Sequence, residues 1–344
     1  MSTQLADLPN ELLLIIISYI TNIREKVRLA SVNSRFHHLV TEACRTQKYK
    51  LVNHSDYLYE SEYKNLEKTE YIVNLPGLLR IAPNLTHFVD KVFHFNYDYN
   101  SDSEDKKKQL SLINTKYIYL DLCEAKVYGK SYEVFDIKAE MILGNIPQVT
   151  TLDIRMDKYL ESPICLMNNL KVFKFTYNTL EWLFPSRIPN DIILNAPNLE
   201  EVSFNSTFVT IDPELTEFLT DLSTHCPNLR VLEMFFQGIA DPSILEDGYL
   251  YLDLDESKIN FPKLEYIKLT GWSDIASWIW EKILSLAPNL KYLSFDLKVN
   301  DEIESLILEH CPNAKYNLEK PFEIEEEFRI YNQKIRGFDE SRYL

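Results

Sequence analysis

The chain has 344 residues, of which 45% are hydrophobic and 26% charged, and its formal net charge is −16 at pH 7. This composition is typical of a folded protein with a large apolar core. The first 50 residues contain seven Lys/Arg and four Asp/Glu, so the acidic excess lies in the rest of the chain and argues against nucleic-acid binding, which requires a basic surface.

The first predicted helix begins after Leu8-Pro9 and is apolar on nearly every side, since residues 12–17 form an unbroken apolar run. The run is too short to span a bilayer and no basic segment precedes it, so we expect neither a membrane anchor nor a secretion signal. About 45 residues rarely close a core of their own, so we expect the following residues, another protein, or both to complete this apolar surface. A second apolar series within a basic stretch consists of Val27, Leu29, Val32, Phe36, Leu39 and Val40.

A short Pro-Asn turn recurs through the rest of the chain at intervals typical of repeat proteins. Cys226-Pro227-Asn228-Leu229 is the clearest copy, and Thr115 marks a copy that lacks the proline. With residue 115 included, nine units result, and their turn positions are 83, 115, 147, 168, 197, 227, 262, 288 and 312.

Each turn is followed by alternating apolar residues, such as Leu232 and Met234, which predict a short half-buried strand. Helical spacing follows Asp212-Pro213 and Asp301, where an aspartate can cap the first free N–H groups. Alternating strands and helices predict a parallel sheet. Because strands stack about 4.8 Å apart while helices need about 8 to 10 Å, the stack should bend with its strands on the concave side.

The cysteines are predicted to be packing residues. Cys226 and Cys311 occupy a turn position that alanine fills at 82, 196 and 287, so this position requires a small buried side chain. The neighbouring His225 and His310 do not give the paired-ligand spacing of a zinc site, and five scattered cysteines do not form a disulfide framework. The seven glycines do not cluster into a phosphate-binding loop. We therefore predict no metal, no cofactor and no catalytic residues.

The stretch from His225 to Met234, HCPNLRVLEM, resembles leucine-rich repeats of the cysteine-containing type, and the resemblance covers about four fifths of the chain. The asparagine that such repeats carry eight residues after the first leucine is mostly missing; Asn178 fits, whereas Thr207 and Gln237 do not. The resemblance implies an α/β fold: a right-handed solenoid, or horseshoe, with a parallel sheet on its concave face.

The segment from Leu8 to Val40, LPNELLLIIISYI, a spacer and then VRLASVNSRFHHLV, resembles the F-box. The Leu-Pro start, the acidic Glu11 and the valine-to-phenylalanine spacing agree, whereas Ile20 stands where the family commonly has leucine. The resemblance implies a small three-helix domain that docks onto the Skp adaptor of a cullin-RING ubiquitin ligase. The alternative is an N-terminal cap that only seals the first repeat. The positions that match the adaptor contact are Leu8, Pro9, Leu12, Ile16, Ile20, Val32 and Phe36.

These patterns divide the chain into an F-box-like domain (1–45), a leucine-rich-repeat solenoid of about nine irregular units (46–318) and an acidic C-terminal cap (319–344). The implied function is a non-catalytic substrate-recognition subunit of a Skp-cullin-F-box E3 ubiquitin ligase, in the cytoplasm, the nucleus or both. Its partners would be the Skp adaptor, cullin through that adaptor, and an unidentified target protein, with no nucleic acid and no membrane. The alternative is a scaffold that binds the adaptor or another partner without promoting degradation.

Residues at alternate strand positions are predicted to face the concave sheet surface. Tyr266 and Tyr292 fall in one column of that surface, and exposed aromatic side chains beside charges are frequent anchors of protein recognition. The alternative is that tyrosine simply suits strands. The candidate target-binding residues are Glu233, Phe235, Tyr266, Lys268, Tyr292 and Asp296.

Overall fold

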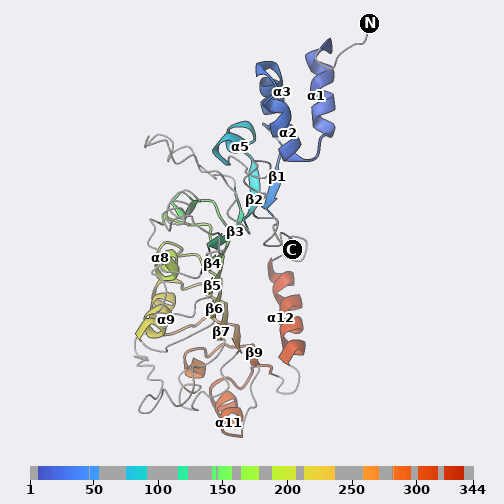
Figure 1. Cartoon of the computed structure of the whole chain (residues 1–344). Coiled ribbons are helices and arrows are strands. Elements are labelled where there is room, and N and C mark those ends of the chain that lie inside the picture. The colour runs from blue at the N-terminus through green and yellow to red at the C-terminus, as the bar shows by residue number, and fades with distance from the viewer. Residues whose placement is uncertain are drawn as a thin grey trace, which may run out of the picture. The chain divides into compact units, whose positions relative to one another are not determined.

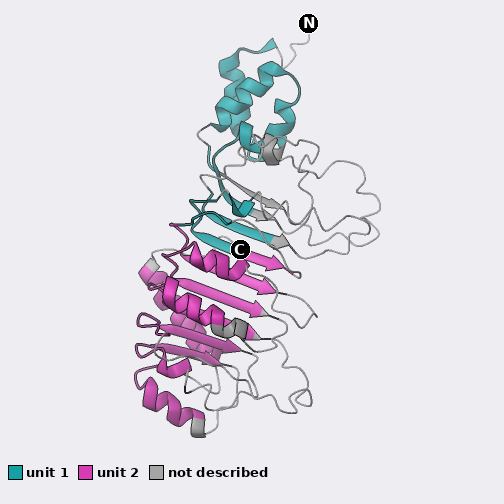
Figure 2. Cartoon of the chain, turned by 90° about the vertical axis from the view of Figure 1, so that its left-hand side faces the viewer, with its two compact units in different colours: residues 1–152, 162–167 teal, residues 153–161, 168–344 magenta. Residues whose placement is uncertain are grey.

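The structure is a computed structural model of the chain. It describes residues 7–45, 47–53, 75–90, 115–122, 142–144, 146–156, 164–177, 188–206, 213–236, 259–270, 281, 283–295, 301–316 and 321–336. The chain forms two compact units, residues 1–152 with 162–167 and residues 153–161 with 168–344 (Figure 2). The divisions predicted after residues 45 and 318 each fall inside one of these units.

The first unit begins with three helices, α1 (Asn10–Tyr19), α2 (Ile23–Ala30) and α3 (Ser34–Cys44). Helix α3 begins after Asn33, whose side chain accepts a hydrogen bond from the backbone N–H of Phe36 at 2.9 Å and so caps a free donor. We call residues 7–45 the N-terminal module. Its buried side chains include Leu13, Ile17, Phe36, Leu39 and Val40.

The rest of the first unit contains β1 (Tyr49–Asn53), α5 (Leu75–Ile81), β2 (Leu85–Asp90) and β3 (Tyr117–Leu122), and the three strands pair in parallel. Thr115 marks the turn before β3; it is fully buried and its hydroxyl donates to the carbonyl of Leu85 at 3.0 Å. The unit that lacks a proline is therefore confirmed. The series of turn positions, which begins at residue 83, did not predict strand β1.

Strand β4 (Thr151–Met156) spans the limit between the two units. The second unit contains β5 (Val172–Tyr177), α8 (Ile188–Leu194), β6 (Glu201–Ser206), α9 (Pro213–His225), β7 (Val231–Phe236), β8 (Tyr266–Thr270), β9 (Tyr292–Phe295), α11 (Asp301–His310) and α12 (Pro321–Arg336). Strands β5 to β9 are parallel neighbours in chain order. The predicted α/β fold with a parallel sheet is confirmed.

The two predicted helices begin where the sequence placed them, α9 at Pro213 and α11 at Asp301. Helices α8 and α9 lie on one side of the strands of the second unit and α12 lies on the other (Figure 1). After the last turn, at residue 312, the described residues form no further strand of the sheet, and Lys315 makes an isolated parallel bridge with Tyr292. None of the described helices is both long enough and apolar enough to cross a membrane.

The inward-facing strand positions form an aromatic stack between the sheet and α9. Phe175 and Phe204 on neighbouring strands have ring centroids 5.8 Å apart, and Phe204 lies 5.3 Å from Phe218 of α9. All three rings are at most 1% exposed. This stack ties two repeat units and a helix into one core.

Two asparagines of the Pro-Asn turns, Asn198 and Asn289, link successive turns. The side-chain amide of Asn198 donates to the backbone carbonyl of Asn168 at 2.9 Å, and that of Asn289 donates to the carbonyl of Pro262 at 2.8 Å. Each bond satisfies a carbonyl of the preceding turn. The sequence analysis expected asparagines eight residues after the first leucine of each unit and did not predict these bonds between turns. The recurring Pro-Asn pair was the signal that could have indicated them.

The predicted role of the turn cysteines as packing residues is confirmed. Cys226 and Cys311 are each 2% exposed, and their Sγ atoms lie 4.0 and 3.6 Å from the carbonyls of Ala196 and Ala287 in preceding turns. Burial, with the nearby charge of Asp221, raises the pKa of the Cys226 thiol to about 12, and burial raises that of Cys311 to about 11. Both thiols are therefore protonated and unreactive at neutral pH. Across the described segments, no cluster of three or more His, Cys, Asp or Glu could hold a metal ion.

Candidate interaction sites

The first candidate site is an apolar stripe along α1, on the side away from the module's own core. Leu12, Ile15, Ile16 and Tyr19 are 47%, 52%, 38% and 81% exposed. Their spacing of three and four residues places them on one face of the helix. Leu13 and Ile17, each 1% exposed, occupy the face that packs inward. We call the exposed four residues the α1 stripe.

Large apolar side chains repeated on one face of a helix are costly to leave in water, and a contiguous group of them marks a protein contact. The helix is also held in place for such a contact. The guanidinium of Arg35 on α3 donates to the carbonyl of Leu8 at 2.6 Å and to the side chain of Asn10 at 2.9 Å. These bonds fix the Leu-Pro start of α1 against α3.

The predicted adaptor-binding residues divide into three groups in the structure. Pro9, Leu12, Ile16 and Val32 are exposed, as a contact surface requires. Leu8 and Ile20 are half-buried. Phe36 is only 5% exposed because it packs in the module core, so in the free chain it offers little area to a partner. Sequence analysis missed Ile15 and Tyr19, although their positions three and seven residues after Leu12 indicated the same helical face.

The second candidate site is the strand face opposite α8 and α9. Residues Glu201, Val231, Tyr266 and Tyr292 are paired in register across β6 to β9, so they form the predicted column. We call them the entry column. The expectation that its tyrosines are exposed was wrong, because α12 lies over them: Tyr266 is 1% and Tyr292 8% exposed. The C-terminal segment, predicted as a cap that closes the stack, thus places its helix on the strand face.

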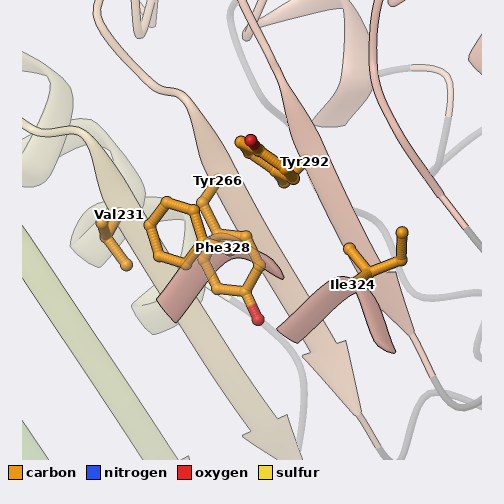
Figure 3. Packing of buried hydrophobic residues seen from close by; sticks show 5 residues of the cluster. All are labelled: Val231, Tyr266, Tyr292, Ile324 and Phe328. Atoms are coloured by element: carbon orange, nitrogen blue, oxygen red, sulfur yellow. The ribbon is translucent and has the colours of Figure 1, made fainter. Parts of the chain in front are cut away.

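The apolar part of this contact is a cluster of five buried side chains, Val231, Tyr266, Tyr292, Ile324 and Phe328 (Figure 3). The ring of Phe328 stacks on that of Tyr266 with centroids 4.0 Å apart and planes 3° from parallel. Its centroid lies 5.5 Å from that of Tyr292, at an interplanar angle of 58°. Phe328 is therefore the central anchor of α12.

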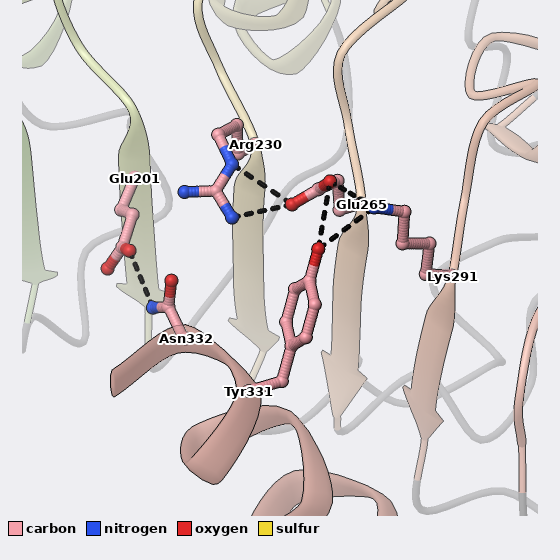
Figure 4. A network of polar contacts seen from close by, with 6 residues as sticks. All are labelled: Glu201, Arg230, Glu265, Lys291, Tyr331 and Asn332. Atoms are coloured by element: carbon pink, nitrogen blue, oxygen red, sulfur yellow. Dashed lines mark hydrogen bonds and ion pairs between the residues drawn. The ribbon is translucent and has the colours of Figure 1, made fainter. Parts of the chain in front are cut away.

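A polar network surrounds the cluster (Figure 4). Glu265 accepts hydrogen bonds from Arg230 at 2.5 Å, from Lys291 at 2.5 Å and from the hydroxyl of Tyr331 at 3.2 Å. The side-chain amide of Asn332 donates to Glu201 of the entry column at 2.7 Å. The starts of the strands and α12 are thus joined by polar contacts at two places, Glu201 with Asn332 and Glu265 with Tyr331.

The acidic half of α12 meets basic side chains of the sheet. Glu325 pairs with Lys268 at 2.8 Å and accepts a hydrogen bond from Ser294 at 3.0 Å, and Glu327 pairs with Lys315. Of the remaining predicted target-binding residues, Glu233 and Phe235 are half-buried, and Asp296 lies outside the described residues.

Glu265 is the titratable group at the centre of the network. Burial tends to raise the pKa of its carboxyl, but the hydrogen bonds and charges of Lys291 and Arg230 outweigh burial, so the pKa lies below its ordinary value of 4.5. The same partnership, with Tyr331, raises the pKa of Lys291. Because the carboxyl pKa is lowered by folding, its stabilising effect is present above the unfolded pKa and is lost as the pH falls through the folded pKa.

Glu265→Gln is therefore expected to lower the free energy of unfolding at pH 7, and to have a much smaller effect at an acidic pH low enough to protonate the wild-type carboxyl, whose pKa is lowered by Lys291 and Arg230. Urea unfolding of both proteins at the two pH values measures this difference. Glu326→Gln is the control, because among the described residues Glu326 pairs with Arg329 of its own helix, and both side chains are more than 50% exposed. An equal loss at both pH values for Glu265→Gln would show that its charge is not the stabilising element.

Comparison with known proteins adds no family to this description: no family model matches the sequence, and no curated protein matches it. The argument for function therefore depends on the two sites and on the sequence patterns that place them.

Proposed function

We propose that this protein is a non-catalytic substrate receptor of a Skp-cullin-F-box E3 ubiquitin ligase. Its N-terminal module binds the Skp adaptor through the α1 stripe, and its strand face, in a leucine-rich-repeat solenoid, holds a target protein. The receptor accelerates ubiquitin transfer by holding the target near the ligase's catalytic subunits, so the contribution is positional. None of its side chains takes part in the chemistry.

The observation that carries this proposal is the α1 stripe. Leu12, Ile15, Ile16 and Tyr19 remain exposed although the module has a closed core of its own beneath them. A segment that served only to seal the first repeat would need no such outward face. The F-box resemblance of Leu8 to Val40 includes Leu12 and Ile16 of this stripe.

The direct test is reconstitution with a purified Skp adaptor. The full chain is expected to form an equimolar complex by size-exclusion chromatography, with calorimetry giving the dissociation constant. Apolar helical contacts of this kind are expected to show a negative heat-capacity change, the signature of apolar burial. A chain that stays monomeric in an excess of adaptor would overturn the proposal.

A receptor and a scaffold differ in what happens to the bound target. If the protein is a receptor, deleting residues 1–45 should lengthen the half-life of a protein captured by the remaining chain, because the target is no longer brought to the ligase. If it is a scaffold, the half-life should not change. Pulse-chase measurement on proteins identified by affinity purification and mass spectrometry separates the two.

A further inference from the structure

The contact between α12 and the strand face has features of a ligand in a groove. Strands β6 to β9 complete their parallel pairing with one another, so removing α12 breaks no strand pairing. The helix contributes Ile324 and Phe328 to the apolar cluster, with Tyr331 packed against it. Nearly all other contacts between α12 and the sheet described above are polar and can be replaced by water.

The fit is also imperfect at one position. The amide of Asn332 donates to Glu201, but its Oδ1 atom is buried and has no hydrogen-bond partner within the described part of the chain. A buried acceptor without a partner is unfavourable. The C-terminal part of α12, which carries Asn332, is therefore held less well than the middle of the helix, which carries Phe328.

The strand face itself cannot remain bare. Without α12, the rings of Tyr266 and Tyr292 and the side chain of Val231 would become exposed side by side, next to the cations of Lys268 and Lys291. Such a surface fits an amphipathic helix with aliphatic and aromatic side chains on one face and an acidic residue beside them. Ile324, Glu325, Phe328 and Tyr331 of α12 present this pattern.

We propose that the strand face under α12 is the docking groove for a partner protein, that the partner inserts an acidic amphipathic helix with this pattern, and that α12 is a built-in competitor for the groove. This inference deepens the proposed function of the strand face, because it names the class of target segment and a means of regulating access. A partner helix must displace α12, so weakening the α12 contact should increase affinity for the partner.

The test uses the full chain and a fluorescent peptide of residues 319–337 as the probe. Phe328→Asp in the chain places a charge against the ring of Tyr266 and should release α12. The peptide is then expected to bind this variant at least tenfold more tightly than it binds the wild-type chain, by fluorescence anisotropy. Ile330→Asp is the matched control on the same helix, since Ile330 is 43% exposed and lies outside the cluster; it should behave as wild type.

A charge exchange makes the test independent of how Phe328→Asp folds. Lys268→Glu opposes Glu325 with a like charge, and Lys268 is a half-exposed strand residue whose replacement the sheet can tolerate. The Lys268→Glu chain should bind a peptide carrying Glu325→Lys at least tenfold more tightly than the unchanged peptide. Equal binding of both peptides, or no binding to either chain variant, would overturn the inference.

The result of the peptide-binding test can be distinguished from the result of the adaptor-binding test of the proposed function. Adaptor binding depends on the α1 stripe, so Phe328→Asp and Lys268→Glu should leave it unchanged. A chain that binds the peptide but not the adaptor refutes only the ligase assignment, whereas one that binds the adaptor but never the peptide refutes only the groove.

Discussion

Replacing Leu12 and Ile16 together by glutamate is expected to weaken adaptor binding by roughly 1,000-fold. Truncating or charging a central apolar anchor costs about 2 kcal/mol or more, and two such losses of about 4 kcal/mol in total correspond to that factor. Both side chains are exposed in the free chain, at 47% and 38%, so the substitutions should leave the module folded. Calorimetric titration with the purified adaptor measures the change.

Ser18→Glu is the matched control for this experiment. Ser18 is an exposed residue of the same helix, and it lies outside the α1 stripe. Ser18→Glu adds one negative charge, against two in the double variant, at a position that the proposed contact does not use, and it should change the affinity less than threefold. If the double variant retained wild-type affinity while circular dichroism showed unchanged helix content, the α1 stripe would not be the adaptor contact.

Phe204→Ala is expected to lower the free energy of unfolding of the second unit by about 3 to 5 kcal/mol, because it removes a buried ring and leaves a cavity. Phe204 is 1% exposed and contacts both Phe175 and Phe218, so its loss weakens the packing between two strands and α9. The same side chains cannot collapse into the gap, since each is fixed by its own strand or helix. Urea unfolding followed by circular dichroism gives the magnitude.

Ser203→Ala serves as the comparison for Phe204→Ala. Ser203 is the preceding residue of β6 and is half-buried on the opposite face, so it should change stability by less than about 1 kcal/mol. A loss below about 1 kcal/mol for Phe204→Ala would mean that the aromatic stack does not hold these units together.

The local elements could be predicted from sequence because each carries its own signal. The Pro-Asn turn and the alternation after it placed the strands from β2 to β9, and even the unit marked only by Thr115 has its strand. The burial of Cys226 followed from the alanines at equivalent turns. The position of Tyr266 and Tyr292 in one column of the sheet could be predicted from the alternation of residues along each strand and from the positions of the turns.

What could not be predicted were contacts between residues distant in the chain. Tyr331 bonds Glu265 across 66 positions, and Asn332 bonds Glu201 across 131. Nothing in the local pattern indicates which surface an amphipathic helix will cover, so Tyr266 and Tyr292 were expected in solvent. The spacing of Ile324, Phe328 and Tyr331 was a signal of an apolar helix face, but the sequence analysis predicted only an acidic cap for this segment. The burial of Phe36 was not predicted for a related reason, because a position matched to a family does not distinguish a core side chain from a contact side chain.

The amide bonds of Asn198 and Asn289 have a consequence for how this architecture can vary. Each of these hydrogen bonds joins a turn to the turn before it, so the crossover segments between the turns take no part in the bond. Turn-to-turn intervals of 21 to 35 residues can therefore occur in one chain without disturbing the hydrogen bonds between turns. The bonds between turns therefore set no limit on the length of a crossover, and the crossovers that carry α8 and α9 are constrained by their own packing instead, since the side-chain amide of Asn190 in α8 donates to Asp221 in α9 at 3.0 Å.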